Sequence, residues 1–331
     1  MNRMPRELRS YAVTLAVVLP VLGAVGILYA VVEQIPAVVT ATLLAAILLE
    51  AALYLAPGFE GVRQALEARL SPRGLALAMT ASAALPYLIY AVPTGQFRLE
   101  GLARLVVLAA AISFWYVCLP RRPIVDLAFV AVIAVVVLTK VFSRIYPSPA
   151  PQAPAEFLGQ LMWIRTGAMS VLAVRHAGGT GFGFWPARRE WAIGACCFLL
   201  FVPVGIPLGL AIGFVSFHPL EAAWWQTLLV TAGTFAGMLW VVALSEEFFF
   251  RGLLQRWLGQ WLERRWAGLA IASLVFGLAH LPFRAFPNWR FALLAAVSGV
   301  FYGLAFEKGG GIRAAMVAHA LVNTAWRLLF R

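Results

Sequence analysis

The residues best able to do chemistry in this sequence are two adjacent glutamates inside a long apolar stretch. Glu246 and Glu247 lie in the helical pattern LWVVALSEEFFFRGLLQRW, which also contains Arg251. Helical spacing places Glu247 and Arg251 at i and i+4, where they can form an ion pair. Glu246 lies about 100° around the helix and faces a different neighbour. Because one arginine neutralises only one acid, the second carboxylate indicates a functional site.

Two histidines are candidates to lie beside these acids in the folded protein. His280 ends the apolar run WAGLAIASLVFGLAH, and His319 begins the sequence HALVN, which places Asn323 on the same helical face at i+4. Glu246 and His280 lie on the two helices of a predicted hairpin. Counting residues along the hairpin places both at a similar depth in the membrane. We therefore expect the four groups to occupy the same level of a helical bundle.

The composition indicates that these polar groups lie in a membrane protein. Of 331 residues, 62% are hydrophobic and 12% are charged, and the mean hydropathy is +0.86. Soluble domains carry about 25% charged residues. These values exclude an ordinary soluble enzyme and a disordered chain, and the presence of only three cysteines argues against a disulfide scaffold. The predicted fold class is an all-α, polytopic transmembrane helix bundle.

The apolar runs predict about ten or eleven spans, since about 17 to 25 residues cross a bilayer. The run at 157–175 is the weakest, because Gln160, Arg165 and Arg175 interrupt it, and an interfacial helix is the alternative. The candidate spans are 11–32, 36–56, 75–95, 101–119, 124–143, 157–175, 191–216, 225–248, 266–281, 290–306 and 312–330.

The net charge of +12 fits a membrane protein without a nucleic-acid partner. With the N-terminus inside, lysine and arginine concentrate in the inner segments, as the positive-inside rule predicts. Because arginine far outnumbers lysine and alanine is abundant, we expect a GC-rich bacterial source. The expected location is the bacterial inner (plasma) membrane, with a cytoplasmic N-terminus and multiple spans.

Two regions differ in their content of ionisable groups. Residues 1–177 form a predicted N-terminal transmembrane region of unknown role, in which Glu50 and Asp126 are the acids within or at the end of a span. Residues 178–331 contain the paired glutamates and both candidate histidines. The glycine-rich segment GGTGFGFWPARREW marks the boundary. We therefore expect the chemistry in the second region.

The polar residues of the second region resemble the motifs of the CPBP intramembrane proteases, which include CAAX prenyl endopeptidases and bacterial Abi-type proteins. Three family motifs, EExxxR, FxxxH and Hxxx(N/D), occur in order, each on a predicted span, and the resemblance covers about residues 180–331. The matching residues are Glu246, Glu247, Arg251, Phe276, His280, His319 and Asn323. The additional N-terminal spans have no counterpart in the smaller members.

The resemblance implies an intramembrane endopeptidase, and the residue types suit that chemistry. Peptide hydrolysis needs a water, a base and donors for the oxyanion. The resemblance implies that Glu246 is the base, and we expect His280 to share the water. His319 and Asn323 would stabilise the oxyanion. In supporting roles, Glu247 and Arg251 would orient the site and Phe276 would pack.

The sequence leaves a metal cofactor open. Two histidines and a carboxylate can hold catalytic zinc with an open water position, so Glu246, His280 and His319 are possible metal ligands. The HExxH spacing of many zinc proteases is absent. A metal-free glutamate mechanism is preferred, and zinc stays the alternative.

Two other classes of function stay open beside the protease. Intramembrane acids and histidines also occur in proton-coupled transporters, but here they concentrate in one half of the chain rather than in two repeats. A catalytically inactive scaffold or immunity protein could retain the same motifs. For a protease, the expected partners are membrane lipid and a membrane-anchored or hydrophobic peptide or protein, with a prenylated substrate as a minority option.

Overall fold

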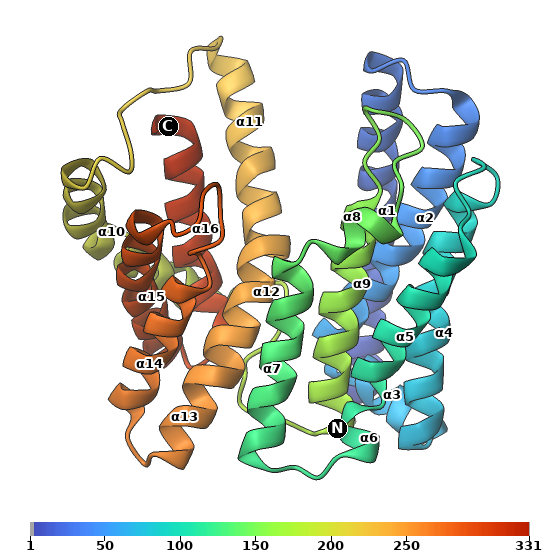
Figure 1. The fold of residues 1–331 in the computed structure, drawn as a ribbon, viewed down its shortest axis with the longest axis horizontal. Helices are drawn as coiled ribbons and strands as arrows, with labels where there is room; N and C mark the ends of the chain where they lie inside the picture. Colours follow the sequence, from blue (N-terminus) through green and yellow to red (C-terminus); the bar gives the residue numbers. More distant parts are fainter. Residues whose placement is uncertain (1–2, 331) are drawn as a thin grey trace. The chain divides into compact units, whose positions relative to one another are not determined.

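The long apolar runs fold into helices throughout residues 3–330, the part of the chain that the computed structural model describes (Figure 1). These residues contain no β-strand beyond isolated bridges. A helix satisfies its backbone hydrogen bonds within one segment, which is required where water is absent. The all-α prediction is therefore confirmed.

Seven of the described helical segments are long and apolar enough to cross a membrane, so the protein is an integral multi-pass membrane protein. The expected runs at 124–143 and 266–281 form shorter helices, and the run at 101–119 is broken after Ser113. Fewer helices than the ten or eleven predicted thus have full span length. The seven are Arg6–Val32, Ala37–Gly58, Pro72–Ala91, Glu156–Val174, Arg188–Ala211, Trp224–Trp261 and Trp289–Gly309.

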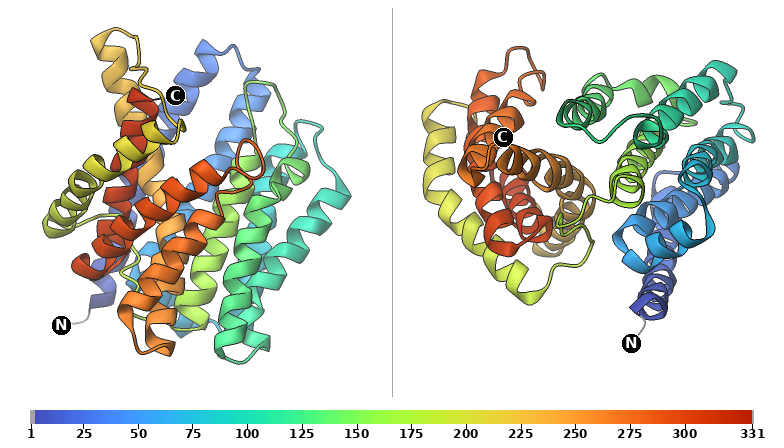
Figure 2. Two further views of the ribbon diagram at one scale, coloured as in Figure 1. Left: turned by 60° about the vertical axis from the view of Figure 1, so that its left-hand side comes forward. Right: turned by 90° about the horizontal axis from the view of Figure 1, so that it is seen from below.

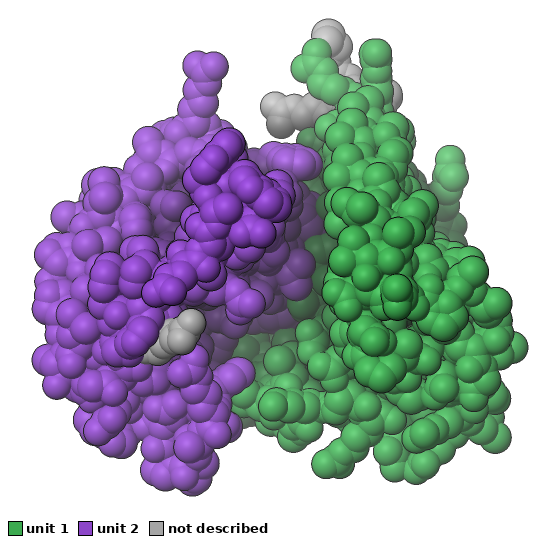
Figure 3. Space-filling model, turned by 90° about the horizontal axis from the view of Figure 1, so that it is seen from above, with its two compact units in different colours: residues 1–177 green, residues 178–331 purple. Residues whose placement is uncertain are grey.

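The chain divides into two compact units, with the boundary between Ala177 and Gly178 (Figure 3). The helices of the first unit are α1 (Arg3–Val32), α2 (Ala37–Leu55), η1 (Ala56–Gly58), α3 (Glu60–Arg69), α4 (Pro72–Ala91), α5 (Leu99–Ser113), α6 (Trp115–Cys118), α7 (Pro123–Leu138), α8 (Val141–Ile145), α9 (Glu156–Met169) and η2 (Ser170–Val174).

The core of the first unit is built around α9, which contacts α2, α4, α5 and α7. Arg165 of α9 is 5% exposed and forms an ion pair with Glu50 of α2, at 2.6 Å between Nε and Oε1. Its terminal nitrogens also donate to the hydroxyl and the backbone carbonyl of Ser82 on α4. The interfacial alternative for this segment is therefore wrong: the arginine that argued against a span faces a buried acid.

A second ion pair in this unit joins α7 to the end of η2. Arg175 donates to both carboxylate oxygens of Asp126, which is 1% exposed, and Tyr116 donates a third hydrogen bond at 3.0 Å. The two buried acids among the described residues of this unit, Glu50 and Asp126, are thus both paired with arginine.

The second unit contains one helical segment much longer than a bilayer is thick. It runs from Trp224 to Trp261, 38 residues, or about 57 Å at about 1.5 Å per residue. Its parts are α11 (Trp224–Gly237), η3 (Met238–Ala243), α12 (Leu244–Glu247), η4 (Phe248–Gln255) and α13 (Arg256–Trp261). Both η3 and η4 are π-helical, and such segments are frequent at functional sites. Glu246 and Glu247 lie between them.

The other helices of this unit are α10 (Arg188–Ala211), α14 (Arg265–Leu278), α15 (Trp289–Gly309) and α16 (Ile312–Leu329). Helix α14 packs on α15, and α10 lies along both α15 and α16 (Figure 2). Glu190 fixes this arrangement, since it accepts from the Ala187 backbone at the start of α10 and from Arg313 of α16. The turn between α15 and α16 uses Gly310 at φ +74°.

Candidate active site

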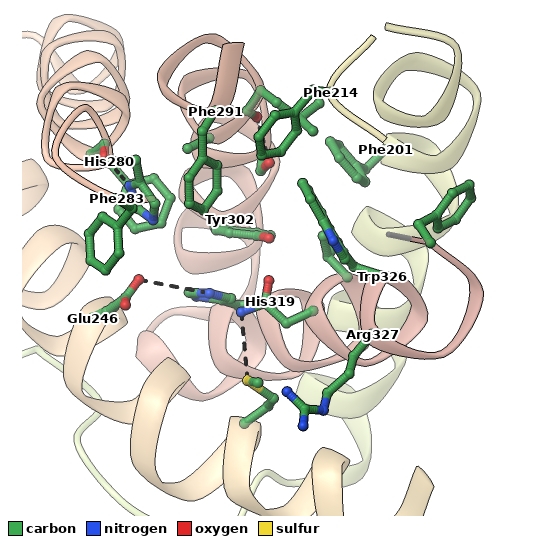
Figure 4. Close-up of a pocket in the computed structure, with 18 of the residues that line it drawn as sticks. Phe201, Phe214, Glu246, His280, Phe283, Phe291, Tyr302, His319, Trp326 and Arg327 are labelled. Atoms are coloured by element: carbon green, nitrogen blue, oxygen red, sulfur yellow. Dashed lines mark hydrogen bonds and ion pairs between the residues drawn. The ribbon is translucent and has the colours of Figure 1, made fainter. Parts of the chain in front are cut away.

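The four residues predicted to do the chemistry line one cavity of about 500 Å³ in the second unit (Figure 4). Glu246 comes from α12, His280 from the turn just after α14, and His319 and Asn323 from α16. Thus the hairpin of α13 and α14 returns His280 to the level of Glu246. The separate faces of three helices meet in this cavity.

His319 lies between the two adjacent glutamates. Its Nδ1 is 2.7 Å from Oε1 of Glu247, and its Nε2 is 3.8 Å from Oε2 of Glu246. The short contact assigns the Nδ1 proton to the bond with Glu247. His319 and Glu247 are 3% and 0% exposed, whereas the Glu246 side chain is 32% exposed. The two acids therefore have different environments: one is buried in a network and the other faces the cavity.

Oε2 of Glu246 is a buried acceptor without a hydrogen-bond donor among the described residues. A buried oxygen without a donor is costly, and a polar cavity of this size has room for water. A water beside this oxygen would also lie near Nε2 of His319. The geometry therefore offers a place for a water next to a carboxylate.

Arg251 holds Glu247 in place. Its NH1 donates to Oε1 of Glu247 at 3.1 Å, which is the ion pair expected from the i, i+4 spacing, and its NH2 donates to the carbonyl of Gly299 on α15. The guanidinium also lies 4.3 Å from the ring centroid of Phe276. Because Arg251 is fully buried, it links η4, α14 and α15 at the base of the site.

The FxxxH spacing orients His280. Its Nδ1 is 2.7 Å from the carbonyl of Phe276, one helical turn earlier, so Nδ1 carries the proton and Nε2 is left as an acceptor. The ring also packs against Phe276 and Phe291, with centroids 4.7 Å and 4.6 Å away. Phe276 is 2% exposed, so it packs as expected while its backbone positions the histidine.

Asn323 lies one turn beyond His319 on α16 and lines the same cavity. Its amide nitrogen is 3.8 Å from the sulfur of Met238, which is a weak acceptor. Among the described residues, its amide protons therefore have no strong acceptor, and they are available to a ligand.

Tyr302 is a residue of this site that motif reasoning missed. Its ring stacks on His319, with centroids 4.5 Å apart and planes 10° apart, and it is 2% exposed. The stack fixes the plane of the imidazole, while Glu247 fixes its rotation. The signal in the sequence is a tyrosine within the apolar helix that precedes His319, but its register with His319 depends on the packing of α15 on α16.

The cavity walls are aromatic, with basic residues among them, and these residues were also missed. Arg327 could have been found from spacing, since it follows Asn323 by four residues on α16. The additional lining residues include Phe201, Phe214, Phe283, Phe291, Trp326, Phe330, Arg284 and Arg327. An apolar chain with polar backbone groups would fit such walls.

The possible metal ligands were tested against this geometry. No group of three or more His, Cys, Asp or Glu side chains in the described chain is arranged to hold a metal ion. Nδ1 of His319 is engaged by Glu247, and Nδ1 of His280 by a backbone carbonyl. These bonds engage only the Nδ1 atoms, and a carboxylate or carbonyl on that nitrogen is also the usual partner of a metal-binding histidine. Zinc bound by Glu246, His280 and His319 therefore stays the alternative to a metal-free site.

Comparison with known proteins agrees with the motifs. Residues 224–325 match the family described as Type II CAAX prenyl endopeptidase Rce1-like. The matched segment lies within the second unit and covers about a third of the chain. The resemblance to CPBP and CAAX proteases is thereby confirmed for this segment, and the match spans the residues of all three motifs.

One curated relative of the chain is a Bacillus subtilis (strain 168) protein described as "Uncharacterized protein YpbD". It is 29% identical over 91 residues, which is 28% of this chain and 42% of the relative. The chain thus matches less than half the length of that protein. No solved structure matches the chain. Within the second unit, α10 precedes the Rce1-like domain but contributes Phe201 to the cavity.

Proposed function

We propose that the second unit is an intramembrane endopeptidase that cleaves a membrane-anchored or hydrophobic peptide or protein. The observation that carries the proposal is the arrangement of Glu246 and Glu247 on opposite nitrogens of His319, at a cavity that His280 and Asn323 also line. The Rce1-like match supports a protease of the CAAX type at the level of the family.

Glu246 acts as the general base in this proposal. Its carboxylate faces the cavity and has an oxygen without a donor, which suits a water waiting to be deprotonated. Nε2 of His280 serves as a second acceptor that aligns this water. The hydroxide formed attacks the scissile carbonyl carbon, and Glu246 later gives the proton to the leaving amine.

His319 and Asn323 stabilise the oxyanion. The Asn323 amide donates directly, and Nε2 of His319 donates when the ring is protonated between the two carboxylates. Glu247 holds the other ring nitrogen, Tyr302 holds the ring plane, and Arg251 holds Glu247. The proposal keeps the preference for a metal-free glutamate mechanism and assigns no step to a metal.

The cavity chemistry suits a substrate with apolar side chains. Aromatic and aliphatic side chains form most of the walls, and the chain has helices long and apolar enough to cross a membrane. We propose that the substrate enters from the membrane, and that a prenylated tail is one member of this class rather than a requirement. We also propose the bacterial inner membrane as the location, with a cytoplasmic N-terminus, on the basis of the arginine distribution.

The decisive experiment compares newly formed peptide termini in membranes containing the wild-type protein with those containing Glu246→Gln. Loss of the base should lower cleavage by about a hundredfold or more, so the termini made by this protein disappear. Equal abundance and equal melting temperature of the two proteins serve as the control. Identical sets of termini under several growth conditions would contradict the proposal.

A second measurement tests the metal-free mechanism. Metal analysis of the active, purified protein should find zinc far below one atom per chain, and chelation should leave cleavage unchanged. Stoichiometric zinc that follows activity would replace the proposed mechanism with a zinc-dependent one.

A further inference from the structure

A second polar cavity lies in the same unit, farther along the helices that form the candidate active site. It has a volume of about 300 Å³ and is lined by residues of η4, α13, α14 and α15. It shares no lining residue with the active-site cavity. Gln255, in its wall, lies nine residues beyond Glu246, or about 13 Å along the helix. Nothing in the proposed protease mechanism uses this cavity.

One side of this cavity is cationic. Arg256 and Arg265 both line it. Arg256 donates to the carbonyl of Gly178, and its guanidinium lies against Gly179, which has φ +70°. A Cβ at that position would lie 2.9 Å from a guanidinium nitrogen of Arg256, so glycine is needed for the close approach. The charged group is thus held in a defined place, where two arginines can bind a phosphate.

The other side of the cavity carries the Glu307 carboxylate beside the Gln255 amide. Gln255 is 1% exposed, and its amide nitrogen donates to Glu307 at 3.0 Å and to the carbonyl of Gly303. Its amide oxygen is buried and has no donor among the described residues. The Glu307 carboxylate, in the same wall, also accepts hydrogen bonds. An ammonium group in the cavity would donate to the Glu307 carboxylate.

The tryptophans near this cavity indicate the level of the lipid headgroups. Trp257 and Trp261 stack at 6.0 Å on α13, and Trp266 on α14 is 68% exposed. Tryptophan concentrates at the membrane–water interface. The helical segment that contains α13 is also longer than the roughly 30 Å hydrocarbon core, so it extends beyond that core.

We propose that this cavity binds a phosphoethanolamine group, supplied by phosphatidylethanolamine of the surrounding membrane. The phosphate contacts Arg256 and Arg265, and the primary ammonium donates to Glu307. A choline group lacks the N–H donors, and a glycerol group lacks the cation. Both should therefore bind more weakly than ethanolamine. This site is independent of the proposed proteolysis.

The test measures retained lipid on the full-length protein. Delipidated protein is mixed with equal amounts of phosphatidylethanolamine, phosphatidylglycerol and phosphatidylcholine with identical acyl chains, and bound lipid is identified by native mass spectrometry. We expect phosphatidylethanolamine to be retained about tenfold more than either competitor. A tenfold preference is the size of effect that one ion pair, between the lipid ammonium and Glu307, would provide.

Single substitutions connect this preference to the cavity. Glu307→Gln should bring the ratio of phosphatidylethanolamine to phosphatidylglycerol to within about twofold of one, because the carboxylate no longer favours the ammonium or repels an anionic lipid. Arg265→Ala should lower retention of both lipids. Arg264→Ala, at an exposed neighbouring arginine outside the cavity lining, is the matched control and should change neither.

Free O-phosphoethanolamine distinguishes a site for the lipid headgroup from a site for the free compound. If it raises the melting temperature of the wild-type protein but not of Glu307→Gln, and no lipid is selectively retained, the site belongs to the free compound rather than the lipid. Equal retention of the three lipids without any response to the free compound would overturn the proposal. A lipid preference that Glu307→Gln leaves unchanged would do the same.

Discussion

At the scale of residues, the adjacent glutamates Glu246 and Glu247 have different environments. Glu247 is fully buried between Arg251 and His319, whereas Glu246 is partly exposed to the cavity. The first is suited to hold a neighbouring side chain and the second to contact a ligand. Substitutions of the two should therefore affect different properties of the protein.

Glu247→Gln should lower stability, while Glu246→Gln should not. Removing one charge from a buried pair costs about 3–5 kcal/mol, because the partner is left without compensation. Thermal unfolding of the purified protein should show a clear loss for Glu247→Gln and a near wild-type value for Glu246→Gln. Equal melting temperatures for the two variants would contradict the assigned division of roles.

Tyr302 is expected to act as a positioning residue through its stack on His319. Tyr302→Phe keeps the ring and should retain near wild-type cleavage, whereas Tyr302→Leu should lower kcat about three- to tenfold, since ring stacking contributes about 0.5–1.5 kcal/mol. Steady-state kinetics on an identified substrate should show little change in KM. A loss of cleavage in Tyr302→Phe equal to that in Tyr302→Leu would argue against the stacking role.

At the scale of elements, buried ion pairs hold helices together where a hydrophobic driving force is weak. Arg165 joins α9 to α2 and α4, and Arg251 joins η4 to α15. Each arginine also bonds a backbone carbonyl or a hydroxyl, so few of its protons lack an acceptor. Helix contacts of this kind are sensitive to the loss of one partner.

Arg165→Met should destabilise the first unit strongly, because it leaves Glu50 buried without its cation. The double variant Glu50→Gln with Arg165→Met should recover much of that loss, since the charge that needed compensation is then absent. Thermal unfolding of the single and double variants measures the coupling.

The exposed pair of Glu100 and Arg104, 74% and 51% exposed, is the matched control. Its disruption by Arg104→Met should change the free energy of unfolding by less than about 1 kcal/mol. A double variant at Glu50 and Arg165 no more stable than Arg165→Met would show that the charges are not the cause.

At the scale of the whole molecule, the charge distribution predicts the orientation in the membrane. Arg264 and Arg284 lie beyond opposite ends of α14, so one short apolar helix separates them. The positive-inside rule places the arginine-rich turn at Arg264 on the cytoplasmic side. The other turn should then face the opposite side.

Cysteine labelling should reveal this orientation. In a background with Cys118, Cys196 and Cys197 replaced by alanine, Arg264→Cys should react with a membrane-impermeant reagent only in inverted vesicles. Arg284→Cys should react in right-side-out vesicles, and both should react after permeabilisation. The reverse pattern would contradict the predicted topology.

The sequence by itself determined the properties that depend on composition and on spacing within one helix. Apolar runs predicted an all-helical membrane protein, and the i, i+4 rule predicted the pairing of Glu247 with Arg251 and the shared face of His319 and Asn323. These relations are local, because helix geometry fixes them whatever the helix packs against. The three motifs also identified residues that line the cavity.

The tertiary structure decided how those helices face one another. Glu247 meets His319 across 72 residues of chain, and Tyr302 stacks on that histidine from another helix. Arg165 likewise lies on a central buried helix, where its charge is paired with Glu50 on α2. The rotation and register of each helix depend on the packing of many side chains together, so no local pattern contains them.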